Sequence, residues 1–127
     1  MALPEDTVAR QLLAEARHLV ERGGAETRGL WPRASALLAR QALEMALRNY
    51  WSTVAPGTEE TSMRGQLLCL EGYMPAATAR QAYVVWSALS RATHHHVYEL
   101  QPIRDELIAW FDTVAVVVEQ TERAWRR

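Results

Sequence analysis

The sequence of 127 residues predicts an all-α fold: one domain over residues 1–127, built as a bundle of about five helices. Apolar residues recur at helical spacing along most of the chain, and no segment alternates between apolar and polar residues as a half-buried strand would. Glycine and proline divide the chain into segments of helix length with short connections, which favours antiparallel neighbours in a bundle. The length suits one domain with a substantial core.

The first helix is expected to open at Pro4. Proline is tolerated in a first turn, and the acidic side chains of Glu5 and Asp6 favour the positive end of the helix dipole. Apolar residues at helical spacing then predict its inner face. This face comprises Val8, Leu12, Ala16, Leu19 and Val20.

Two connections frame the second helix. The glycine pair at 23–24 ends the first helix, and residues 25–32 follow as a connection because Pro32 restricts Trp31 to extended geometry. A proline and a glycine within residues 52–61 predict the longest loop there. The second helix is therefore expected over residues 33–51.

Charged residues four apart support the second helix, namely Arg40, Glu44 and Arg48. Its broad apolar stripe comprises Leu37, Leu38, Ala42, Met45 and Leu47. A short third helix is expected over residues 62–72. The fourth opens near Ala76 and turns three large residues inward, Tyr83, Trp86 and Leu89.

The last helix follows Pro102. Its apolar residues recur at helical spacing, and they are Ile103, Leu107, Trp110, Phe111, Val114 and Val118. The valine-rich run at 114–118 has local strand propensity, but the polar residues around it keep the helical period. The tryptophans Trp86 and Trp110 are expected in the core or in a dimer interface, whereas Trp31, in its connection, is a candidate for stacking on a base.

Composition and charge narrow the class of protein. Apolar residues make up 49% of the chain, charged residues 23%, and the formal net charge is -1, which excludes a disordered tail, a collagen-like rod and a disulfide scaffold. The single cysteine, Cys69, fits a reducing compartment. No apolar run is long enough to cross a bilayer and the N-terminus lacks the pattern of a signal peptide, so we expect a cytoplasmic protein with no membrane partner. The balanced charge argues against binding nucleic acid through overall electrostatics, and we expect no DNA partner.

The candidate site is the histidine tract, His94, His95 and His96, between the fourth helix and the last. Such dense ionisable residues are difficult to place in a core, because buried imidazoles need hydrogen-bond partners. A metal site is disfavoured, because successive helical side chains diverge by about 100°. The only pair sharing a face, His95 and Glu99, does not complete a zinc site. We therefore expect no metal and no other cofactor.

Two interpretations of the tract remain open. Histidine near the C-terminal end of a helix is electrostatically favourable and needs no further role. Alternatively, a histidine transfers protons in cleavage of RNA while Arg91 binds the phosphate through its planar fork of donors. Arg91 and His96 are five residues apart, about 140° round an ideal helix. They converge only if the helix ends or bends near Thr93, or if two copies meet across a dimer axis.

The segment from Arg91 to His96 has the pattern Arg-x4-His, which resembles the motif of the HEPN superfamily. These are small all-helical domains found in many prokaryotic toxins and RNA-cleaving defence proteins. Tyr98 extends the likeness to Arg-x4-His-x-Tyr, the form of one toxin branch that is paired with a nucleotidyltransferase antitoxin. Residues 36–47 are similar to the amphipathic helix that many such domains carry near their start.

This resemblance implies a metal-independent endoribonuclease that acts on RNA as a homodimer, with two Arg–His motifs lining one cleft. It implies that His96 is the general base or acid, that Arg91 holds the scissile phosphate, and that the product is a 2′,3′-cyclic phosphate. Either His94 or His95 takes the role of His96 or orients it. Tyr98 is the residue that a nucleotidyltransferase antitoxin would modify, or else an aromatic residue that packs under the motif.

One departure from the family motif supports a different function. Ala92 stands where many active members have a polar residue directly after the arginine. The alternative is a non-catalytic HEPN-like module that binds a nucleotide, an RNA or a protein partner. A third reading is a structural bundle with an incidental histidine tract.

Overall fold

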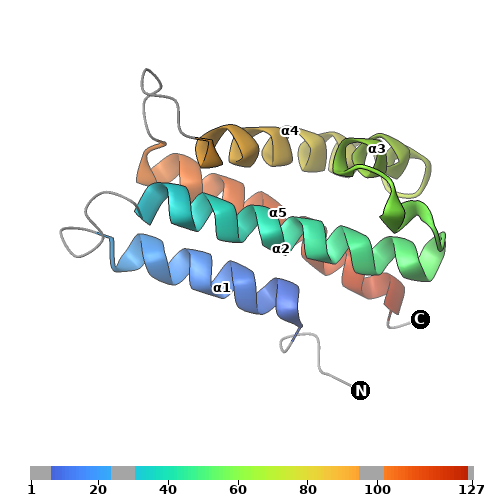
Figure 1. Ribbon diagram of the computed structural model, residues 1–127, viewed down its shortest axis with the longest axis horizontal. Helices are drawn as coiled ribbons and strands as arrows, with labels where there is room; N and C mark the ends of the chain where they lie inside the picture. The colour runs from blue at the N-terminus through green and yellow to red at the C-terminus, as the bar shows by residue number, and fades with distance from the viewer. Residues whose placement is uncertain (1–6, 24–30, 95–101, 126–127) are drawn as a thin grey trace.

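The computed structural model describes residues 7–23, 31–94 and 102–125, and over these residues it is an all-helical bundle without strands (Figure 1). The prediction of a bundle of about five helices is confirmed. Its α-helices are α1 (Val8–Glu21), α2 (Trp31–Val54), α3 (Met63–Cys69), α4 (Ala76–Thr93) and α5 (Arg104–Trp125). Two short 3-10 helices flank α3, namely η3 (Thr58–Glu60) and η4 (Leu70–Gly72).

The four long helices lie side by side, each antiparallel to the next along the chain (Figure 1). The second of them, α2, packs against α1, α4 and α5 and so forms the centre of the bundle. The short helix α3 lies beside the beginning of α4. The opposite end of α4 lies at the same end of the bundle as the end of α1 and the beginnings of α2 and α5 (Figure 1).

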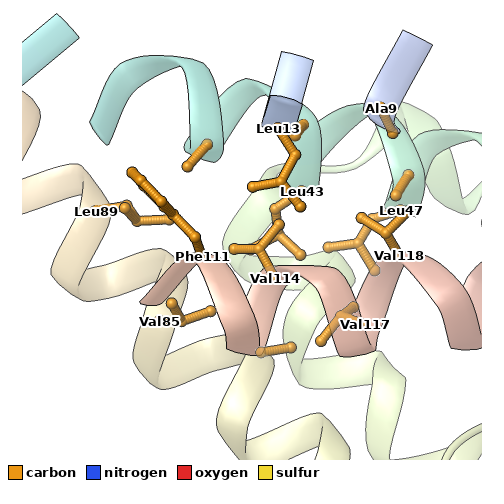
Figure 2. Close-up of a cluster of buried hydrophobic side chains, with 14 of the residues drawn as sticks. Ala9, Leu13, Leu43, Leu47, Val85, Leu89, Phe111, Val114, Val117 and Val118 are labelled. Carbon is orange, nitrogen blue, oxygen red and sulfur yellow. The ribbon is translucent and has the colours of Figure 1, made fainter. Parts of the chain in front are cut away.

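The core is made mostly of aliphatic side chains, with Phe111, Tyr50 and Trp51 among them, and it draws on all four long helices and on the short helices α3 and η4. Phe111 is completely buried, as are Leu43 and Leu89. Figure 2 shows this cluster, and its labelled members are Ala9, Leu13, Leu43, Leu47, Val85, Leu89, Phe111, Val114, Val117 and Val118. The valine-rich run at 114–118 lies within α5, which confirms the prediction that it is helical.

The first helix begins later than the sequence suggested. It starts at Val8, and Thr7 caps it in extended geometry, with its hydroxyl accepting from the backbone N–H of Arg10 at 3.3 Å. The expected opening at Pro4 lies outside the described residues. Ala16 and Val20 are buried as predicted, but near the beginning of the helix Ala9 and Leu13 are buried while Val8 is 52% exposed. The reason is that Thr7 and Arg10 both bind the buried carboxylate of Glu122 on α5, which fixes the rotation of α1.

The central helix α2 is longer than expected at both ends. It begins at Trp31, with Pro32 in the first turn, where proline costs no hydrogen bond. It continues to Val54, so that the expected loop over residues 52–61 is mostly helical, including the 3-10 helix η3. Only a tight turn remains between them, in which Gly57 takes the positive φ of 104° that glycine tolerates best.

The last helix begins with a side-chain cap. Glu106 accepts from the backbone N–H of Ile103 at 3.1 Å, and this bond satisfies a donor ahead of the first turn. Ile103 was expected on the inner face, but it precedes the helix and is 62% exposed. None of the helices in the described ranges is long and apolar enough to cross a membrane.

Candidate functional site

Arg91 lies in the last turn of α4, and its side chain is exposed. The buried residues of α4, including Val85 and Leu89, lie on the side that faces the bundle. Arg91 follows Leu89 by two positions, about 200° round the helix, so it points away from the core. Its guanidinium forms no ion pair with another described residue. An unpaired, exposed guanidinium is available to bind an anion such as a phosphate.

The helix that carries Arg91 stops two residues later. The hydroxyl of Thr93 donates to the carbonyl of Leu89 at 2.7 Å, which takes up a carbonyl of the last turn. His94 is the C-cap, with extended backbone at φ -77° and ψ 139°. The angle of about 140° that an ideal helix would place between Arg91 and His96 therefore does not apply, because the chain leaves the helix between them.

His94 is exposed, and it lies where the carbonyls of α4 form the negative end of the helix dipole. A histidine and an arginine at this end stabilise the helix whether or not they have a further role. The other predicted site residues, His95, His96 and Tyr98, lie outside the described residues. The described chain thus places Arg91 and His94 within one turn of each other.

Ala92 is half-buried and packs against the core of the bundle. A polar side chain at this position would contact the apolar residues of the core. The position directly after Arg91 therefore contributes packing and no hydrogen-bonding group.

Polar side chains form contacts between α4 and α2 near this site, and the sequence analysis did not predict them. The indole N–H of Trp86 donates to Glu44 Oε2 at 3.0 Å, and Arg40 Nε lies 3.6 Å from the same oxygen. The spacing of Arg40 and Glu44 predicted their ion pair, but nothing in the sequence indicates that an indole 42 residues away shares the carboxylate. This bond joins α4 to α2 five residues before Arg91.

Two buried polar atoms of the same two helices lack a hydrogen-bond partner in the part of the chain that the structure describes. They are Arg40 Nε and the hydroxyl of Ser90. Ser90 directly precedes Arg91. The last turn of α4 therefore carries a buried hydroxyl as well as an exposed guanidinium. Of the expected inward residues of α4, Leu89 is fully buried, while Trp86 and Tyr83 are only partly buried.

The tryptophans are used mainly for packing. Trp86 and Trp110 pack, partly buried, against the core, as expected. Trp31 is not in a connection but in the first turn of α2. Its ring lies so close to Gly23 that a Cβ added there would come within 2.7 Å of it. One face of this ring therefore covers the end of α1 rather than being open to a base.

No three His, Cys, Asp or Glu side chains within residues 7–23, 31–94 and 102–125 are grouped as metal ligands. Cys69, on α3, is exposed. Compared with models of protein families, with curated proteins and with solved structures, the chain matches none. The likeness of Arg91 and the histidine tract to the HEPN motif therefore stays a prediction.

Proposed function

We propose that this protein is a metal-independent endoribonuclease of the HEPN type that acts as a toxin or as a component of a defence system. Arg91 and His96 of two subunits line one cleft and cleave RNA there. The observation that carries this proposal is the end of α4, where an exposed arginine that forms no ion pair with another described residue is followed within two residues by the end of the helix. This ending frees the histidines from the helical register that would keep them away from Arg91.

The reaction is an attack by a neighbouring hydroxyl. His96 removes the proton from a ribose 2′-hydroxyl, and the 2′-oxygen then forms a bond to the adjacent phosphorus. The bond from phosphorus to the 5′-oxygen breaks, and this oxygen takes up a proton as it leaves. The products are a 2′,3′-cyclic phosphate and a 5′-hydroxyl. Arg91 binds the phosphate oxygens and stabilises the charge that develops on them.

The second proton transfer needs a second acid or base. His94, at the end of α4, and His95 are the candidates within the same subunit. In the proposed dimer the partner subunit contributes its own motif to the same cleft, as the two-fold symmetry of small homodimers allows. Arg91 faces away from its own bundle, which favours a cleft completed by a second chain.

Regulation of this activity is proposed at Tyr98. A nucleotidyltransferase-type antitoxin would attach a nucleotide to its hydroxyl, and the added bulk and negative charge would block the cleft. We place the enzyme in the cytoplasm, where the exposed thiol of Cys69 stays reduced.

One observation favours the second candidate, a non-catalytic module that binds a nucleotide, an RNA or a protein partner. Ala92 packs against the core and offers no polar group beside Arg91. In this case Arg91 binds the phosphate but no proton transfer follows. Binding of RNA without cleavage distinguishes this module from the enzyme.

The test is cleavage of end-labelled single-stranded RNA in excess chelator by identically purified variants. We expect wild type to cleave, and Arg91→Ala and His96→Ala each to lower the rate at least about a hundredfold. The matched control is Arg48→Ala, which removes an exposed arginine of α2 and leaves the rate unchanged. If His96→Ala retains its rate and replacement of all three histidines abolishes it, the catalytic role belongs to His94 or His95. If no variant and no wild-type preparation cleaves but wild type binds RNA, the binding module is favoured.

A further inference from the structure

A groove lies between α3 with η4 on one side and the first half of α4 on the other. Its volume is about 220 Å³. One wall is formed by Leu67, Leu68 and Glu71, and the other by Ala79, Arg80, Tyr83 and Val84. The α4 residues of the groove lie in the first half of the helix, whereas Arg91 lies in its last turn.

The two walls present apolar side chains to solvent. Leu68 is 62% exposed and Val84 is 60% exposed, although both are large aliphatic residues. Between them the floor of the groove is also apolar, since Leu67 and Ala79 belong to the core. Apolar side chains that gather around a concave surface are typical of an interface with another protein.

Each wall also carries one charge that has no partner. Glu71 on η4 and Arg80 on α4 are both exposed, and neither forms an ion pair with another described residue. The charges are opposite in sign and lie on opposite walls of the same groove. A surface with this arrangement is complementary to a copy of itself turned by half a rotation.

We propose that this groove binds a second copy of the chain across a two-fold axis. The axis passes through the groove and exchanges its two walls, as an isologous interface requires. Val84 then packs against Leu68 of the partner subunit, and Arg80 pairs with Glu71 of the partner subunit. Both contacts occur twice, so the interface buries four exposed aliphatic side chains and neutralises four charges.

This interface is separate from the proposed catalytic cleft and does not rest on the ribonuclease proposal. Val84 precedes Arg91 by seven residues, about 10 Å along α4. The residues of this interface therefore do not include Arg91 or the histidines, and its test does not depend on cleavage of RNA.

The test uses two charge reversals whose effects cancel only in a mixture. Glu71→Arg leaves two arginines on the interface, and Arg80→Glu leaves two glutamates. Each variant alone places like charges opposite each other and should weaken self-association about tenfold or more. An equimolar mixture of the two variants restores both pairs, because each arginine then faces a glutamate of the other chain.

The measurement is sedimentation velocity of the full-length protein over a range of concentrations. We expect wild type and the mixture to reach twice the mass of either single variant at the same concentration. Arg48→Glu, an exposed reversal on α2 outside the groove, should behave as wild type, and circular dichroism shows that every variant is folded. Single variants that keep the mass of wild type, or a mixture that stays at the mass of the single variants, would overturn the proposal. A wild type that stays monomeric at the highest concentration would also overturn it.

Discussion

Glu122, near the end of α5, binds two residues at the beginning of α1. Its carboxylate is only 2% exposed on α5, and it accepts from the hydroxyl of Thr7 at 2.7 Å and from Arg10 Nε at 2.6 Å on α1. Burial of a carboxylate is favourable only when such partners compensate for the loss of water. The charge therefore fixes how α1 lies on α5, and it explains why the inner face of α1 differs from the simple apolar pattern.

We expect Glu122→Gln to lower the free energy of unfolding by about 1–3 kcal/mol. The neutral amide has only one oxygen that accepts hydrogen bonds, and it carries no charge to pair with Arg10. The matched control is Glu119→Gln, one turn away on α5. Glu119 forms an exposed pair with Arg123, and its loss should cost less than about 0.5 kcal/mol. Urea unfolding of the three proteins measures the difference, and equal costs for the two variants would contradict the role given to Glu122.

Tyr50 gives a prediction that depends on pH. Burial raises the pKa of its hydroxyl above the usual value of 10.0, and the neighbouring Tyr73 raises it further. The folded state therefore keeps this proton more tightly than the unfolded state. Stability is unaffected below the unfolded pKa and falls as the pH rises above it.

Tyr50→Phe should remove this part of the alkaline destabilisation. We expect wild type to lose more stability than the variant between neutral pH and about pH 10.5, where an unfolded tyrosine is mostly ionised. The readout is the midpoint of urea unfolding at both pH values. The same loss in both proteins would show that Tyr50 ionises equally in the folded and unfolded states.

At the scale of helices, periodicity predicted which segments are helical better than it predicted where they begin. The rotation of α1 and the early start of α2 both depend on contacts between distant residues: Glu122 with Thr7, and the ring of Trp31 with Gly23. Local helix propensity does not predict either contact. By contrast, much of the inner face of α5 follows from its sequence, because Leu107, Phe111 and Val114 repeat at helical spacing and all three are completely buried.

The packing of α2 on the end of α1 can be tested with two glycines. A Cβ at Gly23 would come within 2.7 Å of the rigid ring of Trp31, so Gly23→Ala should cost about 1–3 kcal/mol. At Gly72 nothing lies within 4 Å of a Cβ, and the backbone has no positive φ. Gly72→Ala should therefore be neutral or stabilising by about 0.4–1 kcal/mol. Thermal unfolding that ranks the two variants in the opposite order would contradict this packing.

At the scale of the whole molecule, the bundle was predictable and the site only partly so. The sequence pointed to Arg91 because a positive charge and a histidine tract meet at a helix end. The bond between Trp86 and Glu44, which joins that helix to α2, connects residues with no recognisable spacing. The groove between α3 and α4 was equally invisible, because its exposed leucine and valine occur in segments that otherwise read as ordinary helix.

The two proposed functions use residues at different ends of α4. One end carries the exposed arginine next to the histidine tract, and the other end carries the groove with its paired apolar and charged residues. If both proposals hold, self-association through the groove and cleavage of RNA depend on different residues of α4. Variants at Glu71 or Arg80 should then change the mass of the protein and leave cleavage of RNA intact.

The most direct test of the central claim is the chemistry of the RNA ends produced in excess chelator. Attack by the 2′-hydroxyl predicts fragments with a 2′,3′-cyclic phosphate and a 5′-hydroxyl from wild type, and none from the variant in which His94, His95 and His96 are all replaced by alanine. Fragments with a 3′-hydroxyl and a 5′-phosphate would contradict the mechanism. Cyclic ends formed equally by the variant without these histidines would remove the site from the tract altogether.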